Sequence, residues 1–519
     1  MARCFRASGF FLFMSFNMMF DVYRSHHYPT SGWIAFLCLM VLCISSPDSW
    51  ADDKDTSLRL NQGIELRADQ QEQEILKDED YLRGERPSLI IDGQSYTVQH
   101  DSNDVGRALY VSLQKKQWSS VKFFLEEYEE FADADPMLLA YARGAIARME
   151  GNLERAETEY RQLIDLKPDF LPGQLELARV LFENRKDADS DKVFSTIQQT
   201  LNPADARQQG VSTTVDSFLQ ALDKRQSWQG SFSIGPTWVD NLNQSSESYS
   251  CLLYFGNVCF YERETPKAVK AHGLDYEATL NKRFALSGHH GVFFRSLLFG
   301  QSYKDHADFN ESQISSQLGY SYHAQRNQFS FAPSFDFSRY GQRSMYGAWG
   351  LHSEWLHYVS DRVLFKLEAD YKDQQYRQED YAAYNGDIWS AYATAWYVFP
   401  HRWTVFGGVD WTQKQAEVEP YAYQQIGIRA GLSKEFNEDI NAVLFASVRQ
   451  RKHDEFNALL GEQREDIEQN YTLIVRFPGL SFYGLEPNLT LKHRKVHSNV
   501  NWLYSYERNA VSFRLEKQF

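Results

Sequence analysis

The feature that most constrains this fold is a two-residue alternation of apolar and polar side chains through the last 291 residues. In the stretch 274–280, for example, the apolar residues alternate with Asp275, Glu277 and Thr279. This period predicts a β-strand with one apolar and one polar face. It recurs in fourteen segments, namely residues 229–240, 274–280, 291–301, 313–322, 329–337, 349–358, 363–371, 388–399, 403–411, 426–436, 443–449, 471–477, 485–492 and 510–515.

These strands are predicted to close into a membrane barrel. Aromatic residues make up 52 of the last 291 residues but only 15 of the 177 between Asp52 and Trp228. Several lie near strand ends, as Trp396, Tyr397 and Trp403 do, which is typical of the aromatic girdles of outer-membrane barrels. A soluble β-sandwich or β-propeller would turn its apolar faces inward and use more Val, Ile and Leu.

The predicted connections between the strands alternate in length. Short ones fall at residues 287–288, 325–327, 360–361, 400–401, 437–439 and 478–479, and long ones at residues 242–269, 377–385 and 453–461. Short turns at one rim and longer loops at the other form the outer-membrane pattern. The predicted fold class is therefore a 14-stranded antiparallel transmembrane β-barrel over residues 229–519. Charges on the polar strand faces are predicted to point into its lumen, among them Asp336, Glu368, Asp370 and Arg449.

The last strand carries a predicted barrel assembly signal. Phe519 ends an alternating stretch that has Phe513 and Leu515 on its apolar face, as outer-membrane barrels do for their assembly machinery. Lys517 departs from this signature, because it occupies a position on the apolar face.

Residues 1–51 are predicted to be a cleaved secretory signal. An apolar stretch at residues 33–44 follows basic residues and precedes the small-x-small triplet Ser49-Trp50-Ala51. This apolar core, about a dozen residues long, is too short to span a bilayer comfortably, which argues against an uncleaved anchor. Residues 52–104 are acidic and poor in aromatic residues, so they are predicted to form a flexible arm.

Two cysteines, Cys251 and Cys259, remain after removal of the predicted signal. They lie in a polar, turn-rich stretch of a chain that has entered an oxidising compartment, which predicts a disulfide closing a surface loop. A cysteine metal site would need further ligands nearby, and the sequence offers none of the required kind.

Residues 105–228 show the 3.6-residue period of helices instead. The predicted helices are residues 105–117, 118–131, 136–149, 153–165, 170–184 and 188–200, with a last one ending near Trp228. A recurrence of 34 or 35 residues indicates degenerate tetratricopeptide repeats, with repeat packing positions at Gly144, Ala156, Tyr160, Pro168, Ala178 and Phe194. Stacked repeats form a solenoid whose concave face binds a peptide or a partner, and a plain structural spacer is the alternative.

The sequence has no local catalytic or cofactor-binding motif. It contains neither a Gly-rich phosphate loop between a strand and a helix nor a His-Glu-x-x-His motif, so no cofactor and no metal are expected. His289 and His290 fall in a predicted tight turn and are interpreted as a solvated pair. The formal net charge of −15 argues against a nucleic-acid partner bound through a basic face.

The order of these segments resembles the Slam family, the surface lipoprotein assembly modulators of Gram-negative bacteria. The resemblance covers residues 105–519 and rests on three stretches. Residues 175–182 look like the family's last repeat, and Gln226-Ser227-Trp228 precedes the first strand in the family manner. Residues 238–243, Trp-Val-Asp-Asn-Leu-Asn, are similar to the family's aromatic-x-Asp-Asn-x-Asn ending of strand one.

This resemblance implies a non-enzymatic outer-membrane protein that translocates or displays a client, either a surface lipoprotein or a secreted haem-binding protein. Its helical repeats would lie in the periplasm and capture the client, and its barrel would pass the client across. The expected partners are the client, outer-membrane lipid and the barrel assembly machinery. The residues that bind the client are not identified.

The client would pass through the lumen or through a parted seam between the first and last strands. Gly230, Gly235 and Pro236 favour weak pairing there, because Gly weakens strands and Pro removes a ladder donor. Two other classes stay open. One is a passive porin-like channel, and the other is an outer-membrane hydrolase whose Ser, His and acid meet only in space.

Overall fold

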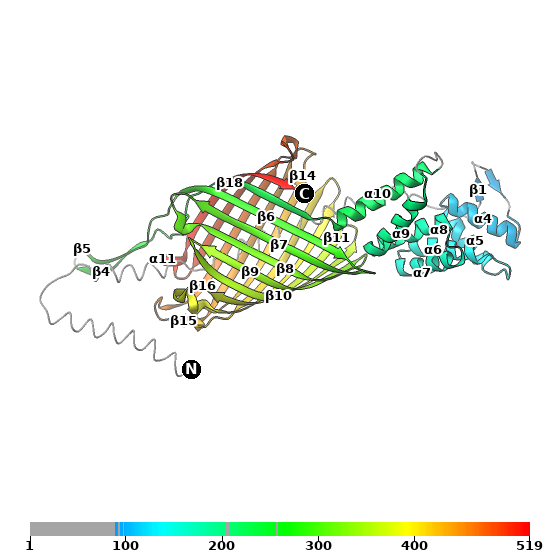
Figure 1. Cartoon of the computed structure of the whole chain (residues 1–519). Coiled ribbons are helices and arrows are strands. Elements are labelled where there is room, and N and C mark those ends of the chain that lie inside the picture. The colour runs from blue at the N-terminus through cyan, green and yellow to red at the C-terminus, as the bar shows by residue number, and fades with distance from the viewer. Residues whose placement is uncertain (1–88, 92–93, 97, 203–207, 256–257) are drawn as a thin grey trace. The chain divides into compact units, whose positions relative to one another are not determined.

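The computed structural model describes residues 89–91, 94–96, 98–202, 208–255 and 258–519 (Figure 1). The predicted signal at residues 1–51 and most of the predicted arm lie outside the described residues. Where the arm is described, β1 (Leu89–Ile91) and β2 (Gln94–Tyr96) pair as a small antiparallel sheet.

Seven described helices precede the barrel: α4 (Ser102–Gln114), α5 (Trp118–Tyr128), α6 (Pro136–Met149), α7 (Leu153–Leu166), α8 (Leu171–Glu183), α9 (Asp187–Thr200) and α10 (Gln209–Gln226). Local signals set where they begin. The carboxylate of Asp101 accepts hydrogen bonds from the backbone N–H groups of Asn103 and Asp104, which caps α4. Pro136 stands in the first turn of α6, where its missing N–H costs no hydrogen bond. Within the described part of the chain, no helix is long and apolar enough to span a bilayer.

The helices pack as successive pairs that share a continuous core. Ala156 and Tyr160 of α7 are fully buried against α6 and α8. The Tyr160 ring lies directly over Gly144, where an added Cβ would come within 2.8 Å of the ring. Glycine at position 144 therefore sets how closely α6 and α7 approach.

The next layer repeats the arrangement with different residues. Ala178 of α8 and Phe194 of α9 are buried in one cluster with residues of α10, so α10 covers the end of the stack. Pro168 lies exposed in the turn between α7 and α8 and belongs to neither core. The helical, tetratricopeptide-like class predicted for this part of the chain is confirmed.

Fourteen strands close into one antiparallel barrel in which β18 pairs back to β3, and the predicted fold class is confirmed. Figure 1 shows neighbouring strands such as β6 to β10 running side by side at a slant along the wall. The strands are β3 (Gln229–Val239), β6 (Ala271–Ala285), β7 (His290–Tyr303), β8 (Glu311–His323), β9 (Asn327–Tyr340), β10 (Arg343–Ser360), β11 (Val363–Tyr376), β12 (Gly386–Phe399), β13 (Trp403–Lys414), β14 (Tyr423–Glu435), β15 (Asn441–Asn457), β16 (Glu462–Arg476), β17 (Glu486–Ser498) and β18 (Tyr506–Gln518).

The wall of the barrel is apolar outside and polar inside. Along β18, for example, Phe513 and Leu515 are exposed on the outer face, while Ser512, Arg514 and Glu516 are buried inside. A closed sheet leaves no unpaired strand edge, so it satisfies its own backbone groups within lipid. Such a wall suits a bilayer rather than water.

Short connections gather at one end of the barrel, here called the turn rim, which carries residues 286–289, 324–326 and 361–362. The opposite end, the loop rim, carries residues 240–270 and 377–385. The chain enters β3 at the turn rim, two residues after the end of α10.

The loop rim adds detail to the predicted connections and shortens one of them. The stretch 242–269 contains a second sheet, made of β4 (Tyr249–Phe255) and β5 (Val258–Glu264). Only two residues join β9 to β10, and Gly341 there has a φ of +59°, which suits a tight turn. Most of residues 453–461 belongs to β15, because a hairpin can go on pairing beyond the bilayer, where both of its faces are polar.

Trp396 was also placed wrongly, since it does not belong to an interfacial girdle. It is 5% exposed and lies on the inner face of β12, where its ring is 6.5 Å from that of Phe406. Its neighbour Tyr397 faces outward instead. Because strand side chains alternate, a shift of one position decides which face a residue occupies.

Candidate functional site

The seam, defined as the joint between β3 and β18, is the least paired joint of the barrel. Its ladder has seven residue pairs, whereas each of the other thirteen joints between described barrel strands has eleven to fourteen. It is also the joint between the first and last strands, so no hairpin turn connects its two sides. The seam therefore has the weakest backbone ladder among the fourteen joints of the described barrel strands.

The seam ladder breaks in the middle. Pairing stops between Thr237 and Ile234, which leaves Gly235 and Pro236 of β3 without partners on β18. Proline has no N–H to donate to a ladder. At Gly235 the two backbones approach so closely that an added Cβ would lie 2.0 Å from the carbonyl oxygen of Phe513.

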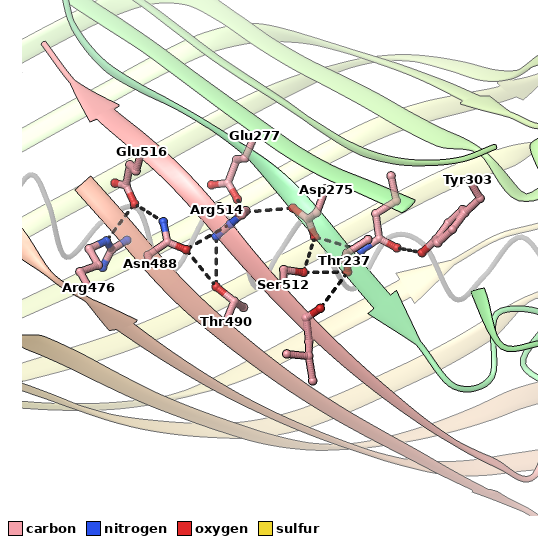
Figure 2. A network of polar contacts seen from close by, with 12 residues as sticks. Thr237, Asp275, Glu277, Tyr303, Arg476, Asn488, Thr490, Ser512, Arg514 and Glu516 are labelled. Atoms are coloured by element: carbon pink, nitrogen blue, oxygen red, sulfur yellow. Dashed lines mark hydrogen bonds and ion pairs between the residues drawn. The ribbon is translucent and has the colours of Figure 1, made fainter. Parts of the chain in front are cut away.

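Side chains inside the lumen close the seam where the ladder does not (Figure 2). The guanidinium of Arg514 on β18 lies 3.1 Å from Asp275 and 3.3 Å from Glu277, both on β6. These contacts reach past β3 to the strand beyond it. The hydroxyl of Ser512 donates to that of Thr237 at 2.8 Å, directly across the seam.

The same arginine is anchored on the other side by β17. Its guanidinium donates to Asn488 and Thr490, both at 3.4 Å. Glu516, one position further along that face of β18, accepts from Arg476 of β16 and from Asn488, both at 3.0 Å (Figure 2). The last three strands are thus tied into one polar unit.

A clasp closes the seam at the loop rim. The carboxylate of Asp240 accepts from the backbone N–H of Asn509 at 2.7 Å and from its side-chain amide at 2.6 Å. The amide of Asn241 donates to the carbonyl of Glu507 at 2.9 Å. At the turn rim, Gly230 and Phe519 exchange two backbone hydrogen bonds. Hydrogen bonds thus hold the seam at both ends, and its ladder is interrupted at two positions of β3 between them.

The β4–β5 hairpin rises from the loop rim beside this clasp. Cys251 and Cys259 are joined by a disulfide within it. At its base, the hydroxyl of Ser246 donates to the carbonyl of Trp502 at 2.5 Å, and the guanidinium of Arg263 lies 3.8 Å from the centre of the indole ring. Because Trp502 lies in the connection between β17 and β18, the first loop of the barrel contacts the last loop.

The inner face of the barrel carries charged side chains that neutralise one another. Asp410 of β13 accepts hydrogen bonds from Arg429 of β14 at 2.9 Å and from Arg449 of β15 at 2.8 Å. All three residues are at most 4% exposed. These charges are therefore paired with one another and shielded from solvent.

One cluster in the described part of the chain has the residue types of a metal site. His352, Glu354 and Glu368 offer ligand atoms within 4.8 Å of one another. The ammonium group of Lys366, however, lies 2.7 Å from Glu354 and 3.5 Å from Glu368, and His352 binds Asp370 at 2.9 Å. A lysine thus already supplies the positive charge that a metal would bring, and the cluster is an ion-paired part of the lumen.

Helices α9 and α10 contact strand β6 and the turn that follows it. Asp187 at the start of α9 binds Arg225 of α10 at 2.7 Å and Arg283 of β6 at 3.2 Å. The carboxylate of Asp189 accepts from the backbone N–H of Gly288 at 2.7 Å.

The predicted solvated pair in this turn was wrong for His289. It is buried, with one ring nitrogen 2.8 Å from the carbonyl oxygen of His323 and the other 3.1 Å from the carboxylate of Glu154 on α7. Burial opposes the charge of Glu154, but hydrogen bonds from His289, Asn184 and Lys186 outweigh it and lower the pKa of Glu154 to about 2. A contact with a distant helix buries this turn, and no local pattern reveals that.

Some residues of the site could not be recognised from the sequence. Asp275, Asp410 and Arg514 are ordinary polar members of alternating strands, and only the register of the sheet shows which charges meet. Asp240 and Asn241 did stand out as part of a motif, but their partners lie more than 260 residues away.

The chain is similar to known proteins over nearly all of its length. Residues 228–519 match the family described as surface lipoprotein assembly modifier, and residues 91–194 match the N-terminal TPR repeats of the same description. The hemophilin secretion modulator of Acinetobacter baumannii is 43% identical over 93% of this chain and 99% of its own. The surface lipoprotein assembly modifier of Pasteurella multocida (strain Pm70) is 26% identical over 80% of this chain and 82% of its own.

Among solved structures, the outer membrane channel DcaP of Acinetobacter baumannii overlaps 56% of this chain and 96% of its own, with 9% identity and a TM-score of 0.35. A TM-score this low supports no conclusion. The descriptions of the matching families name assembly and secretion rather than catalysis.

Proposed function

This chain belongs to the surface lipoprotein assembly modifier family, and from that premise we propose that it moves a client protein across the outer membrane. The closed barrel and the family together place it in that membrane. Its role is transport, and no enzymatic step is assigned to it.

The proposed client is a secreted protein of the hemophilin type. The observation that carries this choice is the 43% identity to a hemophilin secretion modulator over almost the whole of both chains. The lipoprotein assembly modifier of Pasteurella multocida is only 26% identical. Because side chains select a client, the greater identity favours hemophilin over a surface lipoprotein.

The helical repeats are proposed to face the periplasm and receive the client there. Helix α10 ends at Gln226, and β3 begins at Gln229 on the turn rim. In outer-membrane barrels the short turns lie on the periplasmic side. The repeats therefore stand where a client coming from the inner membrane would first meet this protein.

A passive porin-like channel fits the interior less well. The carboxylate of Asp410 and its two arginines are buried inside the barrel rather than lining a wide aqueous pore. Transport of a whole protein then requires a change in the barrel, and binding or folding of the client would have to supply the free energy.

The test is secretion of hemophilin from Acinetobacter baumannii in Escherichia coli, with and without this full-length protein. With it, we expect hemophilin in the culture medium, measured by immunoblot; without it, hemophilin stays in the cells. A periplasmic β-lactamase serves as the leakage control and should stay with the cells in both cases. Retention of hemophilin despite an assembled barrel would contradict the proposed client, and equal release of β-lactamase would indicate a passive pore.

A further inference from the structure

We propose that the client leaves the barrel sideways through the seam, where an extended segment of the client pairs with the freed edge of β18. The inference rests on the proposed function, since it names the route and the binding surface of the same client. It commits to one occupant, a strand-forming stretch of the exported polypeptide.

A client passing through the lumen would have to displace buried ion-paired groups on the inner face of the wall. Asp410, Arg429 and Arg449 form one such group on the neighbouring strands β13, β14 and β15. Glu354 and Lys366 form another on β10 and β11. Breaking such groups is costly because each one leaves a buried charge without its partner. Parting a joint of the wall leaves them intact.

The seam differs from every other joint between the described barrel strands. The joint between β8 and β9 offers a comparison, because its ladder also skips two positions, at Leu318 and Gly319 opposite Ala332 and Pro333. It nevertheless keeps eleven pairs, and a three-residue turn ties its two strands together. The seam keeps seven pairs and has no such turn. An interrupted ladder alone therefore does not make a gate, and only the seam also has ends that can separate.

When the seam parts, β18 stays attached to β17. Strand β18 keeps eleven pairs with β17, and Arg514 keeps its bonds to Asn488 and Thr490 on that strand. The seven pairs of the seam ladder are lost. Arg514 also loses its bonds to Asp275 and Glu277 on β6, and Ser512 loses its bonds to Thr237 and Asp275. Because all of these side chains are polar and face the lumen, they can exchange partners with a polar segment of the client without exposing charge to lipid.

Of the two edges of a parted seam, β18 is the better one for receiving the client. A parted seam exposes a row of unpaired backbone N–H and C=O groups, which is a template for another strand. β18 contains no proline and offers a continuous edge. β3 is a poorer edge, because Pro236 lacks an N–H and the backbone at Gly235 has no side chain to pack. An extended client segment is therefore expected to add to β18.

The clasp explains how the seam stays shut at rest. Four hydrogen bonds that involve Asp240 and Asn241 hold the end of β3 to Asn509 and Glu507 at the loop rim. Asp240 and Asn241, which belong to the motif at residues 238–243, therefore have a positioning role. They keep the seam closed at the loop rim.

A disulfide lock across the seam tests the proposal. Thr237→Cys with Ser512→Cys replaces a pair of hydroxyls that are 2.8 Å apart and face the lumen. Opposite residues of antiparallel strands have Cα atoms about 4.5–5.5 Å apart, within the range that a disulfide spans. The matched control is Ser390→Cys with Thr412→Cys, the same two residue types with hydroxyls 3.2 Å apart on β12 and β13.

Hemophilin secretion is measured for the parent and both locked proteins, before and after a reductant is added. We expect the seam lock to abolish secretion and the reductant to restore it, which also shows that the locked barrel is folded. The control lock should secrete like the parent. Undiminished secretion by the seam-locked protein would overturn the lateral route while leaving the proposed function intact. If the parent itself secretes nothing, the proposed function fails, and this inference fails with it.

A photocrosslinking measurement tests the binding surface separately. Phe513→p-benzoylphenylalanine places a probe on the outer face of β18, where the side chain is 49% exposed. Trp389→p-benzoylphenylalanine on β12 is the control, since Trp389 is 50% exposed. During secretion, hemophilin should crosslink to position 513 and not to position 389. Secretion without any crosslink at position 513 would contradict pairing with β18.

Discussion

Replacing Asp410 with alanine is expected to lower the free energy of unfolding of the barrel by about 3 to 5 kcal/mol. The carboxylate is the hydrogen-bond acceptor for two guanidinium groups, Arg429 at 2.9 Å and Arg449 at 2.8 Å, and all three groups are buried on the inner face of the barrel. Its removal leaves two buried positive charges facing each other without an anion between them. The measurement is denaturant-induced unfolding of the refolded protein in lipid vesicles, followed by tryptophan fluorescence.

The control for this prediction is an acid that lies close in sequence but outside the lumen. Glu417 follows β13 in the connection to β14 and is exposed, so Glu417→Ala should change the free energy of unfolding by less than about 0.5 kcal/mol. Asp410→Asn separates charge from shape, because it keeps the size of the side chain and loses the anion. If Asp410→Asn lowers the free energy of unfolding nearly as much as Asp410→Ala does, the effect comes from the lost charge. Wild-type stability of both Asp410 variants would show that the lumen is wetter than the buried contacts indicate.

The strands could be predicted because their physical cause is local. A barrel wall between lipid and a polar interior forces alternation, and the sequence shows that alternation at every one of the fourteen strands. The contacts among Asp410, Arg429 and Arg449 could not be predicted in the same way. They meet because Asp410 and Arg449 both pair with Gly427, and a slip of one residue in either joint would turn one charge toward lipid.

The β4–β5 hairpin could not be predicted from the two-residue alternation. Its apolar residues occur on both faces, since Leu252, Leu253 and Phe260 are all exposed, so the two-residue period that marks the wall is missing. The stretch was therefore predicted as a loop, and only the cysteine pair suggested order. His289 was misread for a related reason, because its burial depends on Glu154, which lies 135 residues earlier in the chain.

The seam could be predicted only in part. Gly235 and Pro236 indicated weak pairing from residue type alone, and the ladder breaks at those residues. What the residue types did not reveal is the replacement for the lost pairs. Arg514 reaches across β3 to Asp275, so the joint is weak in its backbone and held by side chains. A joint built in this way can open and close again without refolding either strand.

Replacing Tyr160 with alanine is expected to destabilise the helical repeats by about 3 to 5 kcal/mol, the range for truncating a large aromatic side chain in a core. Tyr160 is fully buried, packs over Gly144, and meets the ring of Tyr141 edge-on at 6.0 Å. Its hydroxyl is buried and has no hydrogen-bond partner among the described residues. Tyr160→Phe removes only that hydroxyl, so it should cost little or even stabilise the fold.

Thermal unfolding of the full-length protein in detergent, followed by circular dichroism at a helix wavelength, measures the stability of both variants. Equal losses of stability for Tyr160→Ala and Tyr160→Phe would contradict the packing role of the ring.

The same pair of variants separates capture of the client by the repeats from its passage through the barrel. The ring lies far along the chain from the seam, and its loss leaves the fourteen-stranded ladder untouched. If the repeats receive hemophilin before the barrel releases it, Tyr160→Ala should retain hemophilin in the cells above the melting temperature of the repeats, whereas Tyr160→Phe should secrete it at the parental level. Secretion by the alanine variant at that temperature would mean that the barrel takes up the client without the repeats, since unfolded repeats cannot present the concave surface that binding requires.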